Sequence, residues 1–106
     1  MTKGEIVLIP FPFSDLSGNK NRPALVLIDS EDDVTVCFIT AQIKWKSEFD
    51  FSIFPSDING LKMKSLIRLS KFATIDKDLI IGRLGVLEDN YLSKVNKNLI
   101  EILKLK

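Results

Sequence analysis

Arginine is scarce in this 106-residue chain, so its three arginines are the first places to look for chemistry. Twelve lysines accompany only Arg22, Arg68 and Arg83. A guanidinium group is planar, stays protonated and suits bidentate binding of phosphate. Pro23 biases Arg22 toward an extended backbone. Arg68 interrupts an apolar segment, where a charge is costly unless it points into a cleft or finds a carboxylate. Arg68 is therefore either a phosphate-binding group or a member of a structural ion pair.

The composition excludes several kinds of catalytic site. The chain has no histidine, which rules out a Ser-His-Asp triad, a Cys-His pair and a histidine-ligated metal. The one cysteine, Cys37, lies between Val36 and Phe38 and is predicted to be a core residue rather than a nucleophile. A lone cysteine also fits a reducing compartment. The net charge of +1 does not by itself point to an acidic partner, and it does not exclude a local basic patch.

The longest connection in the chain is the most promising place for a binding site. Thirteen residues, Pro10 to Arg22, separate the first two apolar runs, and loops of this length are usually functional or disordered. The first half alternates phenylalanine with proline, whereas Ser17–Asn21 is small and polar. This pattern favours a loop that closes over a ligand. The alternative is an Ω-loop packed by its own phenylalanines.

Basic residues elsewhere give a weaker indication of nucleic-acid binding. Trp45 is a candidate stacking platform for a base, and six lysines are candidates for a basic surface around the arginines: Lys20, Lys44, Lys46, Lys62, Lys64 and Lys71. The alternative is that these lysines are merely solvated.

The elements that must position these residues form one domain over 1–106, because the length suits a single small core. Short apolar runs predict strands over 5–9, 23–28, 34–40, 49–53, 65–70 and 72–75, the last two being one strand or a broken pair. A helical turn capped by Asp76 follows, and helical spacing begins near Asp89. We expect a mainly β fold with minor α content, a small curled antiparallel sheet forming a barrel or half-barrel.

The order of these motifs resembles a known family. Gly4–Leu8, the long loop, Arg22–Leu27 and Ile39–Gln42 are similar to the MazF/PemK/Kid toxins of bacterial type II toxin–antitoxin systems. The segments Ser65–Arg68, Thr74–Asp76 and Ile81–Leu84 continue the resemblance in the same order, so that it covers nearly the whole chain.

The resemblance implies an SH3-like barrel of the CcdB/MazF/Kid type with a C-terminal helix, assembled as a homodimer. It further implies metal-independent cleavage of single-stranded RNA, usually mRNA at short sequences, with no cofactor. Arg22, Thr40 and Arg68 match the family's catalytic positions. The expected partners are the RNA substrate and a cognate antitoxin, with DNA bound only through the antitoxin complex. The apolar run Ile6–Pro10 is too short to span a membrane, so we expect a cytoplasmic protein without membrane contact.

The remaining expectations concern RNA contacts and the general base. Residues near the catalytic positions are expected to bind RNA: Asn19, Lys20, Asn21, Gln42, Ser70 and Lys71. Ser70 stands where the Kid branch has an aspartate, and Ala73 where many members have an arginine. The general base is thus unassigned, with Asp15 as a candidate. The alternative function is a non-catalytic family member that binds, either as a CcdB-like topoisomerase inhibitor or as an antitoxin-linked, DNA-binding regulator.

Overall fold

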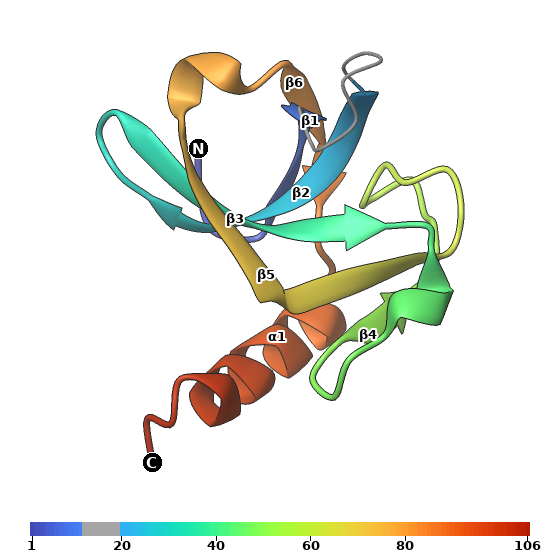
Figure 1. Cartoon of the computed structure of the whole chain (residues 1–106). Coiled ribbons are helices and arrows are strands. Elements are labelled where there is room, and N and C mark those ends of the chain that lie inside the picture. Colours follow the sequence, from blue (N-terminus) through green and yellow to red (C-terminus); the bar gives the residue numbers. More distant parts are fainter. Residues whose placement is uncertain (12–19) are drawn as a thin grey trace.

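A computed structural model describes residues 1–11 and 20–106 of the chain. Its six strands form one antiparallel sheet that curls into a half-barrel, with the order β4-β5-β3-β2-β1-β6 (Figure 1). The strands are β1 (Glu5–Phe11), β2 (Lys20–Asp29), β3 (Asp33–Thr40), β4 (Phe51–Ile53), β5 (Ser65–Asp76) and β6 (Gly82–Val86). Two 3₁₀ turns, η1 (Ile43–Trp45) and η2 (Lys77–Leu79), and the helix α1 (Asp89–Ile102) complete the described part. The predicted mainly β class with a C-terminal helix is confirmed.

The sheet bends most sharply within β5. Cys37 of β3 pairs with Phe72, but the next residue, Phe38, pairs with Arg68, so three residues of β5 have no partner on β3. Extra residues of this kind form a bulge, which bends a strand and redirects its side chains. Figure 1 shows the resulting angle between the two halves of β5. The two predicted segments, 65–70 and 72–75, are therefore one long strand interrupted by a bulge.

Both faces of the sheet are buried, because α1 covers one face and the curl encloses the other. The cluster on the helix face combines sheet residues with Leu87 and Val95, and the partly buried Leu92 and Leu99 of α1 pack against it. The enclosed cluster consists of small and branched residues, with Phe38, Ile75 and Ile80 packed against it: Val7, Ile9, Ala24, Val26, Val34 and Val36. Alternate residues of β2 and β3 therefore face opposite cores.

The C-terminal helix begins where the sequence predicts it. Asp89 lies in the first turn, where a negative charge is favourable beside the positive end of the helix dipole. Glu88 precedes the helix, and its carboxylate accepts hydrogen bonds from Ser56 and Asn59. The predicted cap at Asp76 is also confirmed, since its side chain accepts a hydrogen bond from the Asp78 amide at 2.9 Å. No helix within the described ranges is long and apolar enough to cross a membrane.

Two strand predictions need correction. The sequence pattern missed β6, which pairs with β1 at the edge of the sheet. The predicted strand over 49–53 is shorter, since β4 covers only Phe51–Ile53. Glycine is a weak strand former, so the two glycines of β6 weaken the strand pattern of this segment in the sequence. Gly85 has a packing role, because a Cβ there would overlap the backbone of Ile58 and Asn59.

Candidate functional site

Arg22 and Thr40 lie where β2 and β3 separate. The last pair between these strands is Ala24 with Phe38. Two residues beyond it, Arg22 pairs with Ile9 of β1 while Thr40 pairs with Leu66 of β5. Strand alternation places both residues on the face of Ala24 and Phe38. They therefore lie on one face of two neighbouring strands, at the end where β2 and β3 no longer pair.

Arg68 lies on the same face as Thr40. It pairs with Phe38, and Thr40 pairs with Leu66, two residues earlier on β5. Such diagonal neighbours on one face of an antiparallel pair are about 7–8 Å apart. The order β2-β3-β5 thus brings the three predicted catalytic residues onto one face of three adjacent strands.

Arg68 is held by a carboxylate from the segment before β4. Its Nε donates to Oδ2 of Asp50 at 3.2 Å, and its Nη2 donates to Oγ of Ser47 at 3.4 Å. The Asp50 side chain is 0% exposed, whereas that of Arg68 is 19% exposed. The ion pair expected for Arg68 is therefore present, and because the arginine still reaches the surface, the pair does not exclude phosphate binding.

Thr40 stabilises the turn that follows β3. Its Oγ1 accepts a hydrogen bond from the Gln42 amide at 3.1 Å, just before η1. A threonine hydroxyl retains its own proton when it accepts such a bond. The Thr40 hydroxyl is thus oriented by the backbone and keeps a proton to donate.

The predicted RNA-binding residues that the structure describes are all exposed and close in sequence to the three central residues. Lys20 and Asn21 precede Arg22 at the start of β2, and Gln42 follows Thr40. Ser70 and Lys71 belong to the bulge of β5, two and three residues after Arg68. Asn19, like Asp15, lies outside the described residues.

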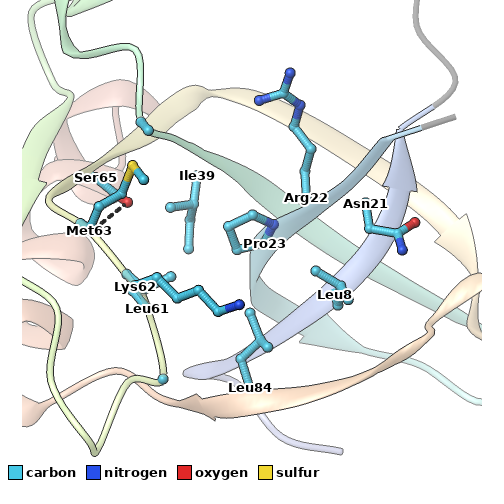
Figure 2. Close-up of a pocket in the computed structure, with 12 residues that line it drawn as sticks. Leu8, Asn21, Arg22, Pro23, Ile39, Leu61, Lys62, Met63, Ser65 and Leu84 are labelled. Atoms are coloured by element: carbon cyan, nitrogen blue, oxygen red, sulfur yellow. Dashed lines mark hydrogen bonds between the residues drawn. The ribbon is translucent and has the colours of Figure 1, made fainter. Parts of the chain in front are cut away.

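A cavity of about 350 Å³ opens on the helix side of the sheet. Its walls include Pro23, Ile39, Leu61 and Leu84, and exposed polar residues such as Lys62 lie at its rim. Arg22 also lines the cavity, and Figure 2 shows its guanidinium extending away from Pro23. Pro23 and Ile39 alternate along β2 and β3 with Arg22 and Thr40, so these two wall residues point to the opposite face of the strands, while Arg22 itself also borders the cavity.

Sequence reasoning missed Asp50, Ser47 and the cavity. Asp50 sits between two phenylalanines in a period-2 pattern, which predicts a half-buried strand rather than a buried carboxylate. The available signal was Arg68 itself, because a charge within an apolar strand requires a partner.

The lone cysteine and the acidic side chains are further candidate reactive groups among the described residues. Cys37 is fully buried, and burial raises the pKa of its thiol to about 12. It is therefore a core residue, as the sequence predicts. Within residues 1–11 and 20–106, no three acidic, cysteine or histidine side chains are grouped to hold a metal ion.

Comparisons with known proteins agree with this architecture. No curated protein matches the chain. The structure is similar to that of a mycobacterial endoribonuclease in complex with its cognate antitoxin, with a TM-score of 0.74 and 19% identity over 100% of this chain and 97% of that one. It is also similar to a second mycobacterial endoribonuclease, with a TM-score of 0.71 and 19% identity over 98% and 91% of the two chains. The family model for the PemK-like, MazF-like toxin of type II toxin–antitoxin systems matches residues 2–103. The chain therefore belongs to the PemK-like, MazF-like toxin family.

Proposed function

We propose that this toxin is a metal-independent endoribonuclease that cleaves single-stranded RNA, chiefly mRNA at short sequences, and thereby arrests growth. The observation that carries the proposal is the placement of Arg22, Thr40 and Arg68 on one face of β2, β3 and β5. The fold shared with mycobacterial endoribonucleases supports it.

The chemistry requires only groups that these residues possess. The 2′-hydroxyl oxygen attacks the adjacent phosphorus, a new P–O bond forms, and the bond from phosphorus to the 5′ oxygen breaks. The products are a 2′,3′-cyclic phosphate and a 5′-hydroxyl, and the proton of the nucleophile is balanced by protonation of the leaving oxygen. Negative charge accumulates on the phosphoryl oxygens in the transition state, where a preorganised guanidinium is most stabilising. Arg22 and Arg68 supply the positive charge that stabilises these oxygens. Thr40 donates a hydrogen bond to a phosphoryl oxygen or orients the 2′-hydroxyl.

An arginine is a poor proton donor at neutral pH because its pKa exceeds about 12. The role we assign to Arg22 and Arg68 is therefore electrostatic stabilisation rather than general acid catalysis. The RNA contacts come from the exposed residues close in sequence to Arg22, Thr40 and Arg68, which are Lys20, Asn21, Gln42, Ser70 and Lys71, together with Asn19.

The proposed partners follow from the family and from its solved relatives. A cognate antitoxin protein neutralises the toxin, as the antitoxin-bound mycobacterial relative supports. The toxin acts in the cytoplasm as a homodimer, and it reaches DNA only within the antitoxin complex.

Expression in bacteria tests this function. Wild-type toxin is expected to arrest growth and to produce discrete fragments of cellular mRNA, whereas Arg22→Ala is expected to do neither. Arg83→Ala is the matched control, because Arg83 lies on the edge strand β6, is 60% exposed at its side chain and pairs with Glu5. Growth arrest and mRNA fragmentation by a folded Arg22→Ala variant would refute the assignment.

A further inference from the structure

The carboxylate of Asp50 is the most unusual buried group outside the three proposed catalytic positions. Continuing the register of β4 and β5 by one residue from the Phe51–Ile67 pair brings Asp50 opposite Arg68. Oδ2 accepts from the Ser47 amide at 3.0 Å and from Arg68 Nε at 3.2 Å. Oδ1 is buried and has no hydrogen-bond partner among the described residues. Asp50 thus uses one carboxylate oxygen to hold two donors.

This arrangement is poorly suited to stability alone. A buried ion pair costs desolvation that its Coulombic attraction repays only when the remaining lone pairs are also satisfied. Those of Oδ1 are not satisfied within the described part of the chain. A buried polar group without a hydrogen-bond partner calls for an explanation in a native fold. The position of Arg68 supplies such an explanation, because it suggests a functional constraint on Asp50.

The contacts of Arg68 show what the constraint does. Nε and Nη2 form one edge of the guanidinium, and this edge is taken by Asp50 and Ser47. Among the described residues no partner is found for Nη1, and the side chain is 19% exposed on the face that carries Thr40. One edge of the guanidinium is therefore clamped while the other remains available to an anion.

We propose that Asp50, assisted by Ser47, is a positioning residue for RNA cleavage that acts through Arg68. The carboxylate fixes the plane of the guanidinium so that its remaining donors meet the scissile phosphate as negative charge develops on it. This inference rests on the proposed ribonuclease function. Asp50 itself does not touch RNA, because its side chain is fully buried.

The test is a kinetic comparison of Asp50→Asn with wild type on a short fluorogenic RNA that contains a mapped cleavage site. Asparagine keeps the size of the side chain but removes its charge. Because misalignment of a transition-state group affects kcat more than binding, kcat is expected to fall about 10- to 100-fold with KM changed less than about threefold. In an Arg68→Ala background, Asp50→Asn is expected to lower kcat no further, since the group on which it acts is absent.

A matched control uses the same substitution at another ion-paired aspartate. Asp29→Asn removes the partner of Lys77, whose Nζ lies 2.7 Å from Asp29 Oδ1, and is expected to keep the wild-type kcat. Ser47→Ala is the second variant, because it removes the Nη2 contact at an exposed position and leaves the buried carboxylate intact. It is expected to lower kcat about three- to tenfold.

The outcomes separate the inference from the function on which it rests. A wild-type kcat in folded Asp50→Asn would overturn the positioning role while leaving the ribonuclease function intact. The same holds if Asp50→Asn lowers kcat by an equal factor in the presence and in the absence of Arg68. If Asp50→Asn does not fold, an unchanged kcat in Ser47→Ala overturns the role instead. Absence of cleavage by the wild-type protein would refute the ribonuclease proposal, and the positioning role with it.

Discussion

Replacing Gly60 with alanine is expected to destabilise the protein by about 2–4 kcal/mol, because two separate features of this position exclude a side chain. Gly60 has φ +73°, a left-handed conformation that costs a residue with a Cβ about 1–2 kcal/mol. The new methyl group would also overlap the carbonyl group of Leu84 on β6. Overpacking of this kind costs about 1–3 kcal/mol.

A smaller effect opposes these costs. Alanine reduces the conformational entropy of the unfolded chain, which stabilises the fold by about 0.4–1 kcal/mol. The overlap involves backbone atoms, so no change of rotamer relieves it, and the opposing term offsets only part of the cost. The Gly60 turn leads directly into Leu61, Lys62 and Met63, which line the cavity, so the same substitution is expected to displace that wall.

Urea unfolding followed by circular dichroism measures the free energy of unfolding. Gly82→Ala is the matched control, because a Cβ at Gly82 meets nothing within 4 Å, and its free energy of unfolding is expected to stay within about 0.5 kcal/mol of wild type. Equal midpoints for the two variants, with equal slopes, would refute the account of the Gly60 turn.

Four further predictions concern the core and its polar supports. A thiol reagent at pH 8 is expected to modify Cys37 only after denaturation, because the thiol is fully buried with a pKa raised to about 12; rapid modification of the native protein would contradict this. Because the pKa of Cys37 is raised in the folded protein, its contribution to stability is complete below the ordinary pKa of 9.0 and declines as the pH rises toward 12. The free energy of unfolding of Cys37→Ser is therefore expected to depend less on pH over that range than that of the wild type. Asn59→Ala is expected to cost about 3 kcal/mol, because the Asn59 side chain accepts from the amides of Ser56 and Leu61 and donates to the Phe54 carbonyl; a change in unfolding free energy below about 1 kcal/mol would contradict it. Val95→Ala removes two fully buried methyl groups from α1 and is expected to lower the unfolding free energy by about 2 kcal/mol in urea titrations, against no measurable change for the exposed Lys97→Ala.

Local sequence patterns predict much of the fold because the periodicities of its elements are strong. Apolar runs locate five of the six described strands, and the 3.6-residue stripe locates α1. The bulge in β5 and the edge strand β6 depend on contacts between distant segments, such as Gly85 against the backbone of Ile58 and Asn59. A local sequence pattern does not predict a contact between distant segments.

The candidate site divides in the same way. The resemblance selects Arg22, Thr40 and Arg68 from the sequence, but their common face follows from the sheet order β2-β3-β5. Asp50 and Arg68 are 18 residues apart, and their pairing requires β4 to lie beside β5. The residues around Asp50, an aspartate between two phenylalanines, therefore do not indicate that Arg68 lies beside it.

The most direct test of the ribonuclease proposal is a gel of long single-stranded RNA incubated with the purified protein in EDTA. Wild type and Arg83→Ala are expected to give the same discrete fragments, which carry 2′,3′-cyclic phosphate and 5′-hydroxyl ends. Arg22→Ala and Thr40→Ala are expected to leave the RNA intact while keeping the wild-type circular dichroism spectrum. Intact RNA with the wild-type protein across several unrelated sequences would contradict the proposal and favour a binding function, with a gyrase supercoiling assay as the next step.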